Sequence, residues 1–189
     1  MMSPVLVHAS CVVLGNAAAP FGAAIEGAVL LMGASGAGKS DVALRLIAMG
    51  ATLLADDQTA LFAEGGRLFA QGISSLHGQM EVRGVGILKA DAITRAPVIL
   101  AVRLDETSKI PRLPEPLTHK LPQGLEGCEE PPFLVLRPFE ASTPAKIAAA
   151  GAGLARGAFV AGLVSPSSGR FFNRNAAIFP APSPTRTKT

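Results

Sequence analysis

Residues 33–40, "GASGAGKS", have the residue types and spacing of a loop that binds phosphate groups, because they fit the pattern G-x-x-x-x-G-K-[ST]. Glycines allow several backbone N–H groups to point at one ligand, and the N-terminus of a following helix adds partial positive charge. The Lys39 ammonium would then reach the β- and γ-phosphates, and the Ser40 hydroxyl would bind Mg²⁺. The residues of this predicted phosphate cradle are Gly33, Ala34, Ser35, Gly36, Ala37, Gly38, Lys39 and Ser40.

Two adjacent carboxylates, Asp56 and Asp57, follow the cradle at the end of an apolar segment. In phosphoryl transfer one carboxylate near the phosphates can hold Mg²⁺, and another can take the proton of the attacking hydroxyl. Since like charges close together push their pKa values apart, neighbouring acids can divide these two roles. Read without the cradle, the pair is equally typical of a turn at a strand end.

The elements predicted around these residues place them at one edge of a sheet. Residues 28–32 indicate a buried strand that runs into the cradle, residues 40–50 a helix with Gly50 at its C-terminal end, and residues 51–57 the next strand. This order is a βαβ-type unit, and ligands of such sheets bind at the carboxyl ends of the strands.

The rest of the chain predicts further strands and helices of an α/β fold. Further strands are expected at 5–14, 84–90, 96–104 and 133–139, a loop at 16–27, a hairpin around residues 65–66, and a helix at 143–164. The proline-rich residues 111–132 indicate a long loop, either a functional flap or a disordered segment. We expect one catalytic domain over 1–164 and a flexible tail over 165–189.

Composition narrows the classes of function. With 49% hydrophobic and 16% charged residues, the 189-residue chain is globular and not disordered. It has no Trp or Tyr, and its net charge of +3 is scattered, which argues against a nucleic-acid partner. No apolar stretch suits a membrane span, residues 1–10 lack the positively charged start typical of a signal peptide, and Cys11 and Cys128 are typical of reduced thiols. We therefore expect a cytoplasmic protein without a membrane partner.

Three segments together resemble the catalytic domain of HPr kinase/phosphorylase, a bacterial family. They are the cradle followed by Asp41, the stretch "LLADD" at 53–57, and "MEVRGVGIL" at 80–88. This resemblance covers about residues 30–90, and a weaker similarity extends from "VHAS" near the start to "LVLRPFEAS". The chain resembles the short form of the family, which lacks an N-terminal domain.

The resemblance implies ATP- and Mg²⁺-dependent phosphorylation of a serine on the phosphocarrier HPr, in regulation of carbon metabolism. It also implies a hexameric assembly and a P-loop kinase fold related to phosphoenolpyruvate carboxykinase, with a mixed β-sheet and flanking helices. In the roles it implies, Lys39 contacts phosphate and Asp57 is the acid/base. The residues implied to bind Mg²⁺ are Ser40, Glu81 and Asp56, and the further catalytic residues are His8 and Arg112. Glu81 and Arg83 also offer a carboxylate and a guanidinium for a second-metal or transition-state clamp.

Departures from the family pattern limit these expectations. The segment between His8 and Gly33 is roughly ten residues longer than in the family. The family pattern P-V-R-P-G-R-N, linked to dephosphorylation, keeps Arg137 and Pro138 here but loses Gly-Arg-Asn. We therefore expect kinase activity more than phosphorylase activity. His77 and His119 have no ligand partners at useful spacing and are assigned to the surface.

Two other functions stay open. One is a P-loop enzyme that phosphorylates a small molecule, which would need an arginine-bearing lid over its pocket. The other is a nucleotide-binding sensor in a signalling pathway, which would bind ATP without transferring it. The phosphoryl donor, ATP or pyrophosphate, and the acceptor, HPr or a paralogue, are also open.

Overall fold

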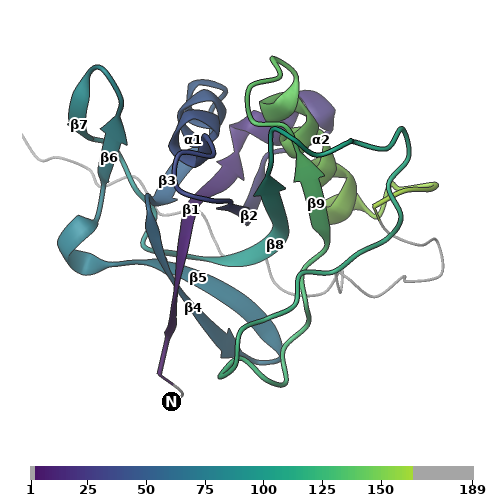
Figure 1. Ribbon diagram of the computed structural model, residues 1–189. Coiled ribbons are helices and arrows are strands. Elements are labelled where there is room, and N and C mark those ends of the chain that lie inside the picture. The colour runs from purple at the N-terminus through teal and green to yellow at the C-terminus, as the bar shows by residue number, and fades with distance from the viewer. Residues whose placement is uncertain (1–2, 164–189) are drawn as a thin grey trace, which may run out of the picture.

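A strongly curved mixed sheet forms the centre of the molecule, and both helices pack against one of its faces (Figure 1). The structure is a computed structural model that describes residues 3–163. Its strands are β1 Val5–Gly15, β2 Ile25–Met32, β3 Thr52–Ala55, β4 Gln58–Glu64, β5 Arg67–Gly72, β6 Gln79–Val82, β7 Gly86–Lys89, β8 Arg95–Leu104 and β9 Phe133–Leu136. The helices are α1 Lys39–Ala48 and α2 Thr143–Arg156, with short 3-10 turns η1 Asn16–Phe21 and η2 Ser74–Leu76.

Strand direction brings four strand ends to one edge of the sheet. β1 pairs antiparallel with both β2 and β3, so β2 and β3 run in the same direction with β1 between them. β8 lies parallel to β2, and β9 lies parallel to β8. The carboxyl ends of β2, β3, β8 and β9 therefore meet at one edge, called here the carboxyl edge. The predicted βαβ unit is confirmed, with β1 inserted between its two strands.

The two faces of β1 pack into two different cores, as the period of two in a strand requires. Val12 and Leu14 face the core shared with α1 and α2. Ala9, Cys11 and Val13 face a second core that is closed by β4 and β5. Figure 1 shows β4 and β5 on the side of the sheet away from the helices. Residues 111–132 contribute Leu121, Leu125 and Cys128 to this second core.

The loop at 111–132 contains no helix and no strand, only a single bridge between Thr118 and Pro132. Leu125 is buried, and the backbone N–H of Glu129 donates to the Gly66 carbonyl oxygen, 3.0 Å away. This part of the loop lines the β4–β5 half of the sheet and leads away from the carboxyl edge (Figure 1). The prediction of a long loop is confirmed, but its middle does not cover the cradle.

The predicted helix at 143–164 is too long. α2 ends at Arg156, because Gly157 adopts φ 60 and the N–H of Ala158 turns back to the Gly153 carbonyl oxygen at 2.9 Å. Such a left-handed glycine is a usual helix end. The glycine at the end of α1 acts in the same way, since Gly50 has φ 102. The predicted tail at 165–189 lies outside the described residues.

Several strand bounds also differ from the expectation. β2 begins three residues early, because Ile25 already pairs with Gly15 of β1. The strand predicted at 51–57 ends at Ala55, so both aspartates lie in the turn before β4. The strand predicted at 84–90 is β7, which pairs with β6 in a separate two-stranded hairpin. None of the helices in residues 3–163 is long and apolar enough to cross a membrane.

Candidate active site

The phosphate cradle connects β2 to α1 at the carboxyl edge, and its backbone needs glycine at two positions. A Cβ at Gly33, where φ is 154, would lie 2.8 Å from the Leu104 carbonyl oxygen. Gly38, at φ 83, has a left-handed conformation and precedes the first residue of α1. No side chain caps this helix start, so the first N–H groups of α1 lack a side-chain acceptor within the described chain. These free donors and the helix dipole make the cradle an anion site.

Lys39 is the buried cation of the site, with only 6% of its surface exposed. Its ammonium nitrogen donates to the carbonyl oxygens of Gly33 and Ala34, both 3.1 Å away, and lies 2.9 Å from His8 Nε2. Burial lowers the pKa of Lys39, and the nearby charges of Asp57 and Asp56 oppose that shift. Three contacts thus hold the ammonium inside the cradle before any ligand binds.

His8 connects Lys39 to Asp57. The two ring nitrogens of His8 have different partners: Nε2 lies 2.9 Å from the Lys39 nitrogen, and Nδ1 lies 3.2 Å from Asp57 Oδ1. Since the ammonium can only donate, Nε2 accepts, and Nδ1 carries the proton that faces Asp57. The prediction that His8 belongs to the site agrees with this chain of contacts.

Asp57 lies in a sharp turn between β3 and β4. It has φ 66, and it is the one non-glycine residue with positive φ between residues 3 and 163. The N–H of Gln58 donates across it to the Asp56 carbonyl oxygen at 2.8 Å, which closes a three-residue γ-turn. Strained backbone of this kind clusters at functional sites. The Asp57 side chain is 68% exposed, so one end of it faces His8 and the other faces solvent.

Asp56 has a different environment, because three donors surround its carboxylate. The hydroxyls of Ser40 and Ser10 both donate to Oδ1 at 2.8 Å, and the backbone N–H of Glu81 donates to Oδ2 at 3.2 Å. This arrangement ties the cradle, β1 and β6 to one carboxylate. Asp56 therefore orients the Ser40 hydroxyl, which is the group expected to meet a metal ion.

Sequence reasoning missed Ser10, although a signal was present. Residues 8 and 10 are two apart in a strand, so both point to the same face of β1. Ser10 is fully buried and directed at Asp56. The signal that could have identified Ser10 is its position two residues after a predicted site histidine in one strand, which puts both side chains on the same face.

The predicted site residues are thus partly brought together. His8, Lys39, Ser40, Asp56 and Asp57 form one connected network. Glu81 reaches this network through its backbone N–H, while its side chain is exposed.

The two predicted arginines, Arg83 and Arg112, are exposed and form no hydrogen bond or ion pair with other described residues. In the same part of the chain, no three His, Cys, Asp or Glu side chains are grouped closely enough to bind a metal ion. The roles predicted for these arginines and for the Glu81 side chain therefore stay predictions.

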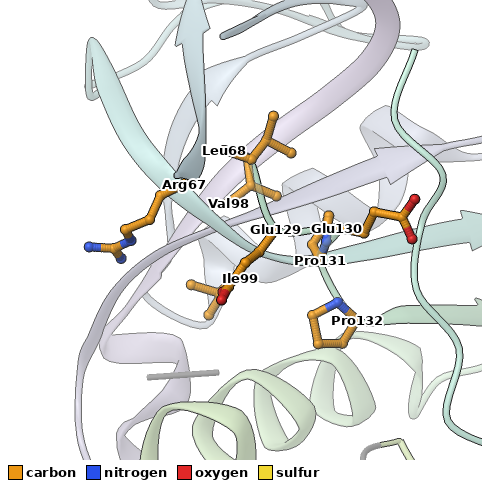
Figure 2. A pocket seen from close by; sticks show the side chains of 8 residues that line it. All are labelled: Arg67, Leu68, Val98, Ile99, Glu129, Glu130, Pro131 and Pro132. Atoms are coloured by element: carbon orange, nitrogen blue, oxygen red, sulfur yellow. The ribbon is translucent and has the colours of Figure 1, made fainter. Parts of the chain in front are cut away.

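A small hollow elsewhere in the molecule does not compete with the cradle as a nucleotide site. It lies beside the start of β8, between Arg67, Ile99 and residues 129–132, and has a volume of about 40 Å³ (Figure 2). Ligand pockets usually have about 300–1,000 Å³. Figure 2 shows the Arg67 and Glu130 side chains pointing away from each other.

Comparison with known proteins gives one consistent answer. Residues 23–101 match the family described as the HPr Serine kinase C-terminal domain. HPr kinase/phosphorylase of Brevibacillus brevis is 36% identical over 103 residues, which are 54% of this chain and 32% of that protein. The same enzyme of Mycoplasma genitalium is 41% identical over 63 residues, 33% of this chain and 20% of that protein. The resemblance predicted from the three sequence segments is confirmed.

A solved structure confirms the fold. The Hpr(Ser) kinase/phosphatase from Coxiella burnetii superposes with a TM-score of 0.59 and 24% sequence identity, over 76% of this chain and 91% of that one. The mixed α/β fold of an HPr kinase domain is therefore shown. The chain matches a third or less of the length of the two curated relatives named above.

Proposed function

We propose that this protein is an ATP-dependent serine kinase that phosphorylates an HPr-like phosphocarrier. The observation that supports this most strongly is the convergence of Lys39, His8 and Asp57 in one chain of contacts beside an anion-binding cradle. The similarity of residues 23–101 to the HPr kinase domain supports the same substrate class.

In this proposal the cradle binds the triphosphate of ATP. The free N–H groups at the start of α1 and the Lys39 ammonium neutralise phosphate charge, and they do so most effectively as charge develops in the transition state. The oxygen donors at this edge suit Mg²⁺, which prefers hydroxyl, carboxylate and phosphate oxygens. Ser40 would hold the ion, with Asp56 orienting its hydroxyl, and the ion would supply additional neutralisation of the phosphates.

Asp57 is the proposed general base. The serine Oγ of the acceptor attacks the γ-phosphorus, the bond from that phosphorus to the β–γ bridging oxygen breaks, and ADP leaves. The Asp57 carboxylate takes the serine proton, because it is largely exposed, while the contact between its Oδ1 and the Nδ1 proton of His8 orients it. His8 positions this carboxylate relative to the Lys39 ammonium and thus relative to the phosphates.

The openness of the site supports a protein as acceptor. Asp57 is largely exposed, and the neighbouring β6–β7 hairpin presents the apolar side chains of Val85 and Ile87, which are 69% and 71% exposed. A small-molecule kinase usually encloses its substrate to exclude water. By resemblance we also propose a hexameric assembly, a cytoplasmic location and a role for Arg112 near the acceptor.

The test is incubation of the full chain with Mg-ATP and purified HPr or its paralogue, followed by intact-mass spectrometry of the carrier. We expect one phosphoryl group on a serine, and much slower labelling by the Asp57→Asn variant. Two parallel reactions are run. The first replaces ATP with pyrophosphate as the donor, and the second incubates the phosphorylated carrier with inorganic phosphate to measure phosphorylase activity. Labelling of metabolites alone would favour a small-molecule kinase, and ATP binding without any transfer would favour a sensor. Either outcome contradicts the proposal.

A further inference from the structure

An exposed aromatic ring lies at the rim of the phosphate cradle. Phe139 follows β9 and is 61% exposed. Its ring edge lies against the last glycine of the cradle: a Cβ added at Gly38 would be 3.2 and 3.3 Å from the Cε1 and Cζ atoms of Phe139. Single exposed apolar residues are common on proteins. Phe139 differs from these because it lies beside the predicted phosphate site, where its ring can contact a ligand bound in the cradle.

Contacts from both helices fix the segment that carries this ring. The Arg45 guanidinium on α1 donates to the carbonyl oxygens of Pro138 and Glu140, and it also pairs with Asp41 at 2.8 Å. On the other side, the Thr143 hydroxyl at the start of α2 donates to the Arg137 carbonyl oxygen at 2.6 Å. Figure 1 shows the segment after β9 between the two helices. The backbone that carries the ring is therefore held in place before a ligand binds, which reduces the entropy lost on binding.

Sheet topology gives the direction of a bound triphosphate. The network of Asp56, Asp57 and His8 lies on β3 and β1, so the reacting end of the triphosphate faces that side. Across the carboxyl edge the strand order is β3-β1-β2-β8-β9, with the cradle following β2. The nucleoside end must then leave toward the ends of β8 and β9. Phe139, which follows β9, is the exposed aromatic residue on that side of the cradle.

We propose that Phe139 is a stacking platform for the nucleobase of the phosphoryl donor. This inference rests on the proposed function and deepens it, because it selects a nucleoside triphosphate over pyrophosphate, which has no base to stack. Stacking on one aromatic face tolerates any base. The platform therefore adds affinity for ATP and GTP alike, and the choice between them is made elsewhere.

The experiment compares nucleotide with base-free ligand by calorimetry on the full chain. Dissociation constants are measured for ATP, ADP and inorganic tripolyphosphate, with wild type, Phe139→Ala, Phe139→Trp and the control Phe21→Ala. Phe21 is also partly exposed but lies on η1, away from the cradle. We expect Phe139→Ala to weaken ATP and ADP binding about 5- to 100-fold and to leave tripolyphosphate binding unchanged. Phe139→Trp retains nucleotide affinity, and Phe21→Ala behaves as wild type.

Two results overturn the inference. If Phe139→Ala weakens ATP and tripolyphosphate equally, the ring only supports the cradle at Gly38. If ATP affinity is unchanged while the KM for the phosphocarrier rises, the ring belongs to the acceptor site. Failure of the proposed function gives a different result. In that case wild type binds ATP more tightly than tripolyphosphate, and the ratio of the two affinities depends on Phe139, but no phosphoryl group is transferred to a carrier. This result would support the stacking role of Phe139 and contradict the kinase activity.

Discussion

The turn after β3 and the turn after β8 both place aspartate at the carboxyl edge, but their carboxylates have opposite environments. Asp105, after β8, accepts hydrogen bonds from the Thr107 N–H at 3.0 Å and from the hydroxyls of Thr107 and Ser108 at 2.7 Å. These bonds hold the pKa of Asp105 down to about 2. Asp57, after β3, has as its partner His8 from a distant strand and sits in a strained turn.

The difference lies in where the donors come from. Every donor to Asp105 is within three residues, so this carboxylate shapes its own loop. The donors to Asp56 come from β1, α1 and β6, and Asp57 faces β1. A carboxylate that gathers groups from separate elements can act on a ligand at their junction. We infer that donor origin, more than position at a strand end, separates a catalytic aspartate from a structural one.

Replacing Asp57, the proposed catalytic base, is expected to have the largest effect. Asp57→Asn should reduce phosphoryl transfer about 10²- to 10⁴-fold, because loss of a general base typically costs that much, while ATP affinity stays near wild type. The measurement is carrier phosphorylation in single turnover together with calorimetry of ATP. Asp105→Asn is the matched control and should transfer at nearly the wild-type rate. Near-full activity of Asp57→Asn would show that the base is another group.

The same position allows a test of backbone strain. A φ of 66 suits glycine well and alanine poorly. The free energy of unfolding of Asp57→Gly should therefore be about 1 kcal/mol larger than that of Asp57→Ala, which makes the glycine variant the more stable one. Both variants should be inactive, which separates conformational strain from chemistry. Equal stability of the two, measured by urea denaturation, would mean that the turn relaxes in solution.

Removing the cation should have the next largest effect. Lys39→Ala deletes the ammonium proposed to face the phosphates and should lower transfer about 10²- to 10³-fold, with weaker ATP binding as well. Carrier phosphorylation and calorimetry measure both. Lys120→Ala is the control, since Lys120 is a highly exposed lysine whose contacts are confined to Glu130. Unchanged ATP affinity in Lys39→Ala would contradict the placement of the triphosphate.

The buried state of Lys39 also predicts a pH dependence. Burial lowers its pKa below the ordinary 10.5, so in the free protein it loses its proton at a lower pH than an exposed lysine does. Affinity for tripolyphosphate should therefore fall as pH rises through this lowered pKa, by up to about tenfold per pH unit. The titration runs from neutral pH upward at constant ionic strength. Lys120→Ala should follow wild type, whereas Lys39→Ala should lack this decline. A flat profile in wild type would mean that Lys39 does not face the phosphates.

The features of the fold that depend on a few neighbouring residues were predicted from the sequence. The cradle glycines, the start of α1 and the hairpin around residues 65–66 follow from residue type and spacing, and the structure confirms them. The end of α2 was missed because residues 158–163 are as apolar as the helix itself, and the left-handed Gly157 decides the end. Gly151 and Gly153 lie within α2, so a glycine in the sequence does not by itself mark where a helix stops.

The site itself was predictable as a set of residues but not as a set of contacts. Nothing in the spacing of His8 indicates that β1 inserts between β2 and β3, and this insertion brings His8 and Ser10 to the cradle. The contact of the Glu81 backbone N–H with Asp56 was not predicted, and the role expected of the Glu81 carboxylate stays a prediction. Such contacts depend on which strands pair over long sequence distances, and the local residue pattern of a strand does not identify its pairing partner.

The smallest expected effect concerns the structural aspartate. The pKa of Asp105 is about 2 in the fold and 3.8 in an unstructured chain, so its stabilising contribution is complete above about pH 4 and is lost as pH falls through the folded value. Asp105→Ala should therefore lower the Tm by about 1–3 °C at neutral pH, and the difference from wild type should shrink between pH 4 and pH 2. Calorimetry at several pH values measures it, with Asp105→Asn as the isosteric control. A difference that stays constant with pH would assign the loss to packing, and a large loss of transfer would place Asp105 among the catalytic groups and remove the contrast with Asp57.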